Sequence, residues 1–211
     1  MYLIPAPAKL EKKEGQFIWT YETYVSLDKS CSPLISRQAM LFGDGAEERL
    51  GFRPIIARGA GQEGDVRIVQ DDSMKKESYI LDITEDGICL TGEESGVWLL
   101  QILEQEGAVL GALHIEDEPS IANRGYYFDC ARGRVPKLDW LKKLADRMAY
   151  YKMNQLQLYI EHSYLFRGMT ELWRDDTPLT AEEIMEFDHY CNERGIELVP
   201  SLSSFGHLHK L

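Results

Sequence analysis

The second half of the chain, from Arg124 onward, alternates apolar segments with amphipathic ones, and this order constrains the fold more than any other feature. Three segments read as near-continuous apolar strands: YYFDCA (126–131), LQLYIE (156–161) and IELVPSL (196–202). Between the first two, residues 137–153 repeat apolar side chains at helical spacing, and Thr180 with Glu183 forms a capping box that begins a second helix. Strand, helix, strand, helix, strand is typical of parallel β/α units, so the sequence predicts an α/β fold here.

The first 118 residues carry mixed signals that favour an α+β domain. Three segments are expected to form, in order, a helix weakened by two glycines, a short strand and a later strand: residues 34–50, 65–70 and 109–117. Asp86-Gly87 separates two alternating apolar segments and predicts a tight hairpin turn, while Ser95 is placed to cap a helix over residues 97–106. We therefore expect one domain over residues 1–118 and another over 119–211.

The net charge of the chain and the spacing of its cysteines limit the binding partners and the cellular compartment that we expect. A formal charge of −12 without a basic patch argues against nucleic acid or an anionic membrane as a partner. Four scattered cysteines without a C-x-x-C pattern indicate a reducing compartment. Pro5 and Pro7 interrupt any apolar run at the N-terminus, so the expected location is the cytoplasm, or the exterior if a signal peptide has been removed. His114 has no H-E-x-x-H pattern around it, and we expect no metal site.

Polar residues follow each of the three predicted parallel strands. Asp129 and Arg132 follow the first, Glu161 and His162 the second, and His207 the third, together with Ser203 and Ser204. Ligand sites in β/α architectures lie at the carboxyl ends of the strands. Three polar strand ends in succession therefore predict a binding site at that edge of the sheet.

Three stretches of the chain resemble glycoside hydrolase family 20, the β-N-acetylhexosaminidases. LIPAPAKLEKKEGQF (3–17) and the segment 77–105 are similar to that family's noncatalytic zincin-like domain. The segment 115–158 resembles the entry to its catalytic barrel, with Arg-Gly, Asp129, Arg132, Lys152 and Asn154 at matching spacing. The resemblance implies a zincin-like domain followed by β1-α1-β2-α2-β3 of a (β/α)8 barrel, a partial TIM barrel.

The resemblance also implies roles for the residues at the strand ends. Arg132 matches the arginine that hydrogen-bonds hydroxyls of the terminal sugar, a task suited to a planar guanidinium fork. Asp129 is interpreted either as a second sugar contact or as a structural ion-pair partner of Arg132. Glu161 could act as a general acid, accept a hydrogen bond from a sugar hydroxyl or form an ion pair. His162 and His207 are interpreted either as site residues, at positions where the family orients its catalytic apparatus, or as core or rim residues. Trp173, in the long connection over 162–179, could form an apolar wall for a sugar ring.

The chain departs from the family pattern after the second and third strands. His162 and Ser163 stand where the family has an acidic pair, and VPSLSSFGH (199–207) keeps only Pro200, Gly206 and His207 of the third-strand motif. These departures leave two alternatives open. One is a related glycosidase with a different sugar preference, and the other is a noncatalytic carbohydrate-binding module.

By the same resemblance, the parent enzyme removes terminal β-linked N-acetylhexosamines by substrate-assisted retaining hydrolysis, without a cofactor. The family's catalytic carboxylates follow its fourth strand, which would lie beyond Leu211. We therefore expect the 211-residue chain to be an inactive N-terminal fragment of that enzyme. Its unpaired sheet edges would favour self-association.

Overall fold

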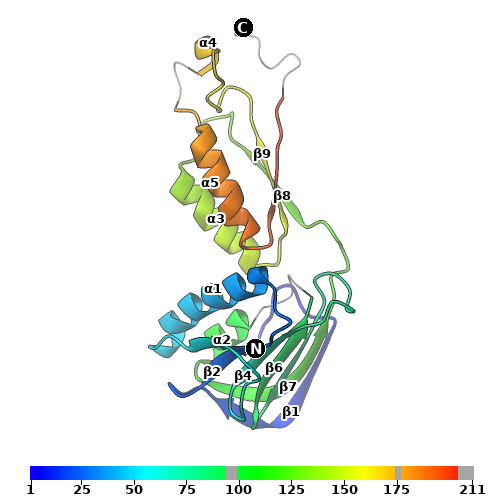
Figure 1. Cartoon of the computed structure of the whole chain (residues 1–211). Coiled ribbons are helices and arrows are strands. Elements are labelled where there is room, and N and C mark those ends of the chain that lie inside the picture. The colour runs from blue at the N-terminus through cyan, green and yellow to red at the C-terminus, as the bar shows by residue number, and fades with distance from the viewer. Residues whose placement is uncertain (94–98, 174–176, 204–211) are drawn as a thin grey trace. The chain divides into compact units, whose positions relative to one another are not determined.

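The computed structural model describes residues 1–93, 99–173 and 177–203 (Figure 1). The chain forms two compact units, residues 1–120 and residues 121–211, and each unit has a hydrophobic core of its own. Both units combine helices with a sheet, so the fold is mixed α and β. Within the described ranges, no helix is long and apolar enough to cross a membrane.

Unit 1 is a seven-stranded mixed sheet with two helices. The strands are β1 (Lys9–Ile18), β2 (Tyr24–Leu27), β3 (Ile55–Arg58), β4 (Val66–Gln70), β5 (Tyr79–Thr84), β6 (Gly87–Gly92) and β7 (Val109–Asp117). They lie in the order β1-β7-β5-β6-β4-β2-β3, parallel from β6 to β3 and antiparallel from β1 to β6. The helices α1 (Pro33–Leu50) and α2 (Leu100–Glu106) cover one face of this sheet and enclose the core with it (Figure 1).

Helix α1 tolerates its two internal glycines because they lie where other elements pack closely against it. The hydroxyl of Ser32 caps the helix by accepting a hydrogen bond from the amide of Ile35. A Cβ on Gly43 would lie 3.0 Å from Cδ1 of Ile56, and a Cβ on Gly45 would lie 2.9 Å from a methyl group of Leu100. The glycines that weaken the helical pattern in the sequence therefore permit close packing against β3 and α2.

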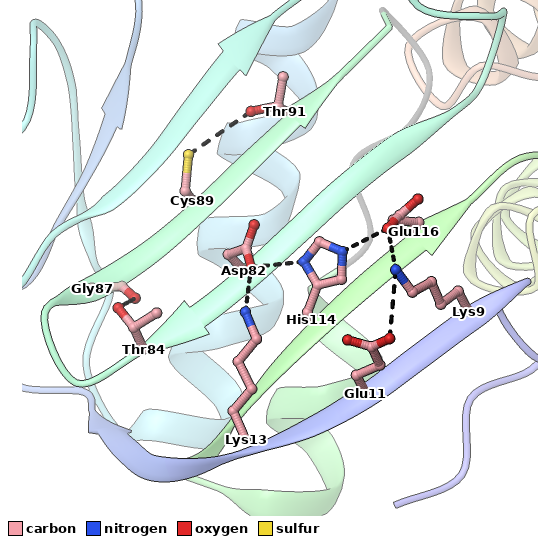
Figure 2. Close-up of polar contacts among 10 residues, drawn as sticks. All are labelled: Lys9, Glu11, Lys13, Asp82, Thr84, Gly87, Cys89, Thr91, His114 and Glu116. Atoms are coloured by element: carbon pink, nitrogen blue, oxygen red, sulfur yellow. Dashed lines mark hydrogen bonds and ion pairs between the residues drawn. The ribbon is translucent and has the colours of Figure 1, made fainter.

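The predicted hairpin at Asp86-Gly87 is present as β5 and β6, which pair from Tyr79↔Gly92 to Thr84↔Gly87. Alternate residues of β5 enter the core, and the others face the opposite side of the sheet. On that side His114 lies between Asp82 and Glu116, with its ring nitrogens 2.8 and 2.9 Å from their carboxylates (Figure 2). Lys13 of β1 contacts Asp82 of β5. Lys9 of β1 contacts Glu116 of β7 and Glu11 of its own strand, so positive and negative side chains alternate across β1, β7 and β5.

Unit 2 is a three-stranded parallel sheet with helices. Its elements are β8 (Gly125–Asp129), α3 (Leu138–Tyr150), β9 (Gln155–Tyr159), α4 (Thr170–Trp173), α5 (Ala181–Asn192) and β10 (Glu197–Val199). The strand order is β10-β9-β8, and both pairings are parallel, as the alternating pattern of the sequence predicts. Helices α3 and α5 lie side by side along one face of the sheet (Figure 1).

The strands of unit 2 are apolar on one face only, which differs from the expectation of near-continuous apolar strands. Leu156 and Leu158 of β9 are buried against α3 and α5, whereas Gln155, Gln157 and Tyr159 alternate with them and are only partly buried. This alternation arises because, in the described part of the chain, helices cover a single face of the sheet. The open face therefore carries polar and aromatic side chains.

The capping box that the sequence predicts at the start of α5 is present. Thr180 Oγ1 accepts from the amide of Glu183, whose carboxylate accepts in turn from the amide of Thr180. Cys130 and Cys191 lie in the core of unit 2, and burial raises the pKa of each thiol to about 12. The proposed cap at Ser95 lies outside the described residues.

Candidate functional site at the carboxyl ends of β8 and β9

The parallel register brings the ends of β8 and β9 to the same edge of the sheet. Asp129, the last residue of β8, pairs with Tyr159, the last residue of β9. The amide of Cys130 then donates to the carbonyl of Tyr159 at 3.1 Å, and Glu161 follows two residues after Tyr159. The polar residues that the sequence placed after two separate strands are thus neighbours in space.

Arg132 is held between two carboxylates at this edge. Its Nη1 donates to Oδ2 of Asp129 at 3.0 Å, and its Nη2 donates to Oε1 of Glu161 at 3.1 Å. Asp129 is fixed locally, because its Oδ1 accepts from the amides of Ala131 and Arg132 at 2.8 and 3.2 Å. Partial burial acts to raise the pKa of Asp129, but the hydrogen bonds from Ala131 and Arg132 outweigh it and lower the pKa. Asp129 is therefore an ionised partner that orients the guanidinium.

Tyr159 contributes two further contacts to the same cluster. Its hydroxyl donates to Oε1 of Glu161 at 2.5 Å, and the Cζ atom of Arg132 lies 4.9 Å from the centre of its ring. Tyr159 and then Asp129 raise the pKa of Arg132, so the guanidinium is charged at every accessible pH. Tyr159 was not among the residues that the sequence predicted for this site. Its signal was its place on the polar face of β9, one residue after the buried Leu158.

Burial differs sharply across the cluster. The side chain of Glu161 is 11% exposed, whereas that of Arg132 is 59% exposed. A buried carboxylate is stable only when its charge is paired and hydrogen-bonded, and Arg132 and Tyr159 provide both interactions to Glu161. The guanidinium thus combines anchored contacts on its inner side with an accessible outer side.

The structure describes only some of the other residues that the sequence predicted near this site. His162 has its Nδ1 3.9 Å from Oε2 of Glu161, so it lies at the border of the cluster. Ser163, next in the chain, is fully buried, and its hydroxyl has no partner among the described residues. The amide of Ser203 donates to the carbonyl of Ile160, which brings the segment after β10 to the end of β9. His207 and Ser204 lie outside the described residues.

Trp173 belongs to the short helix α4, which lies within the long connection that the sequence analysis left without structure. Its indole Nε1 donates to the carbonyl of Phe166 at 3.1 Å. This hydrogen bond ties α4 to the segment after β9.

The chemistry available at this edge is hydrogen bonding to a polar ligand. Arg132 uses two of its five N–H groups for the carboxylates, and guanidinium N–H groups are strong donors to hydroxyl and carbonyl oxygens. Over the ranges that the structure describes, no three His, Cys, Asp or Glu side chains gather as a metal site.

Comparison with known proteins identifies the family. The model of glycosyl hydrolase family 20, domain 2, matches residues 1–118. The chain belongs to glycosyl hydrolase family 20. The resemblance that the sequence motifs indicated is therefore confirmed at the level of the family.

Curated relatives match across the chain. A beta-hexosaminidase of Vibrio furnissii is 26% identical, and the match covers 97% of this chain and 38% of the relative. A beta-hexosaminidase of Akkermansia muciniphila is 30% identical over 64% of this chain and 33% of the relative. The chain thus spans about a third of the length of these relatives.

Solved structures of the family share the fold. The β-N-acetylhexosaminidase from Streptomyces coelicolor A3(2) superimposes with a TM-score of 0.85 at 24% identity, over 99% of this chain and 47% of that one. An exo-β-N-acetylglucosaminidase from Vibrio harveyi, in complex with N-acetylglucosamine, gives a TM-score of 0.82 at 20% identity, over 97% of this chain and 36% of that one. Both matches extend through the two units.

Proposed function

We propose that this chain is the N-terminal portion of a β-N-acetylhexosaminidase, which removes terminal β-linked N-acetylhexosamine from a carbohydrate. In this proposal residues 1–118 form the zincin-like domain and residues 119–211 the first three strands of a (β/α)8 barrel. Support comes from the three parallel strands of unit 2, with their helices on one face, and from the family match. Further strands would pair with the open edges of β8 and β10, which otherwise favour self-association.

The observation that carries the proposal is the anchored guanidinium at the strand ends. Arg132 is fixed by Asp129 and Glu161 and is still more than half exposed. We propose that it donates hydrogen bonds to hydroxyls of the terminal sugar, with His162 and His207 at the border of the same subsite. The acid and the carboxylate that stabilises the attacking acetamido group would come from the strand after those present here, so the 211-residue chain alone would not turn over substrate.

Hydrolysis by the full-length protein tests the proposal. Aryl β-N-acetylglucosaminide and β-N-acetylgalactosaminide are the substrates, and aryl β-glucoside, which lacks the acetamido group, is the control. We expect hydrolysis of at least one N-acetylated substrate and none of the glucoside. Comparable activity on the glucoside, or no activity on any of the three, would contradict the proposal.

A matched pair of arginine variants tests the subsite. Arg132→Lys keeps the positive charge but loses the planar fork, and we expect it to raise KM for the N-acetylated substrate. Arg134→Lys is the control, because Arg134 stacks on Trp140 with its Cζ 5.2 Å from the ring centre and touches neither carboxylate. Equal effects of the two substitutions would remove Arg132 from the proposed subsite.

A further inference from the structure

Tyr159 contacts both Arg132 and Glu161, and its own side chain carries no charge. Its hydroxyl is 2.5 Å from Oε1 of Glu161, and its ring lies beneath the guanidinium of Arg132. The geometry points to Tyr159 as a positioning residue that holds Arg132 in its sugar-binding orientation. This inference rests on the proposed function, and neither the family match nor the relatives assign this residue a role.

The hydroxyl of Tyr159 acts through Glu161. Oε1 of Glu161 accepts from both Tyr159 and Arg132, so one oxygen joins the two side chains. A hydrogen bond from a hydroxyl to an ionised carboxylate is short and strong, and it limits rotation of the carboxylate about its last bond. Without that hydroxyl, Oε1 of the buried carboxylate would lose the hydrogen bond from Tyr159 and would keep its bond from Arg132, a side chain that is itself largely exposed.

The ring of Tyr159 acts on Arg132 directly. An arginine side chain has many rotamers, and a partly exposed one is usually mobile. A flat aromatic surface 4.9 Å from Cζ attracts the cation and restricts motion out of the guanidinium plane. Asp129 and Glu161 restrict motion within that plane, because each holds a different terminal nitrogen. The three contacts together fix the direction of the remaining N–H groups.

A neighbouring tyrosine provides a matched control. Tyr127 lies on β8, and its ring centre is 5.8 Å from that of Tyr159 on the open face of the sheet. Its hydroxyl makes no hydrogen bond within residues 1–93, 99–173 and 177–203. Tyr127→Phe therefore removes a hydroxyl from an adjacent ring without touching Glu161, whereas Tyr159→Phe removes the hydroxyl that bonds Glu161 and keeps the ring.

The first test needs no sugar. Side-chain NMR relaxation of isotope-labelled arginine, measured on the 211-residue chain, reports the order parameter of the Arg132 guanidinium. We expect wild type and Tyr127→Phe to share a high value, and Tyr159→Phe to fall below about 0.6, the range of flexible groups. Glu161→Gln, which keeps the side-chain volume, is expected to loosen Arg132 in the same way. An unchanged order parameter in Tyr159→Phe would overturn the inference.

The second test uses the full-length protein and an aryl β-N-acetylhexosaminide. Because Tyr159 is inferred to orient Arg132, we expect Tyr159→Phe to raise KM about 3- to 10-fold, the loss of one hydrogen bond's net contribution, with kcat nearly unchanged. A fall in kcat with KM unchanged would overturn the inference. If wild type hydrolyses nothing, the proposed function fails, and the order parameter of Arg132 still decides whether Tyr159 positions it.

Discussion

The alternation along β9 predicts that two adjacent residues differ greatly in their contribution to stability. Leu156 is fully buried in the central strand of unit 2, in the same core as Leu141 of α3 and Phe187 of α5. Leu156→Ala removes apolar atoms and leaves a cavity, because neighbours on both helices are also fully buried and cannot easily collapse. Substitutions of this kind cost about 2 to 5 kcal/mol, and we expect about 3 kcal/mol here.

Hydrogen exchange measured by mass spectrometry separates the effect of Leu156→Ala on the two units. Each unit has its own core, so the loss of protection is expected in peptides from residues 121–203 and not in those from residues 1–93. Gln157→Ala is the control, since Gln157 lies on the open face of the same strand, and its cost is expected to stay within about 0.5 kcal/mol.

Two results would refute this reasoning about β9. A cost for Gln157→Ala that equals that of Leu156→Ala would mean that both faces of the sheet are packed in the same way. A loss of protection that spreads equally through unit 1 would mean that the two cores do not unfold separately.

Three further substitutions have defined outcomes. Contacts with Glu116 and then Asp82 raise the pKa of His114, so its stabilising effect is present at low pH and lost as pH rises through the folded pKa. His114→Gln should therefore lower the melting temperature at about pH 5.5 and have little effect at about pH 9. An equal loss at both pH values would contradict this linkage. Ser163→Ala should raise the free energy of unfolding by about 1 kcal/mol in urea denaturation, because the buried hydroxyl has no partner among the described residues. A clear loss of stability would show that the hydroxyl does form a hydrogen bond. Thr180→Ala removes the cap of α5 and should cost about 1 kcal/mol by the same method, whereas Thr180→Ser, which keeps the hydroxyl, should cost much less.

Local signals in the sequence predicted most elements with strong periodicity or turn chemistry. The capping box at Thr180, the hairpin at Asp86-Gly87 and the alternation of strands and helices after Arg124 all have a short-range physical cause, and each is present. A strand over residues 9–18 was not predicted from the sequence. That segment, KLEKKEGQFI, is the edge strand β1, whose residues are almost all exposed, so it lacks the apolar alternation by which strands are recognised.

The candidate site was only partly predictable. The sequence predicted that Asp129, Arg132 and Glu161 lie close together, because parallel strands place their carboxyl ends at one edge of the sheet. Tyr159 was not predicted in this way, since it lies inside a strand, where a tyrosine is usually a packing residue. Its role depends on which face it occupies and on the rotamer that brings its hydroxyl to Glu161, and both follow from tertiary packing. The position of His207 relative to this cluster stays a prediction.

The central claim is that Arg132, anchored at the ends of β8 and β9, contacts the terminal sugar. The most direct measurement is a crystal structure of the full-length protein with bound N-acetylglucosamine. Our account predicts sugar hydroxyls within about 3 Å of the Arg132 guanidinium, with the contacts to Asp129 and Glu161 retained. A sugar bound elsewhere, with Arg132 still paired to both carboxylates and contacting no ligand, would contradict the account.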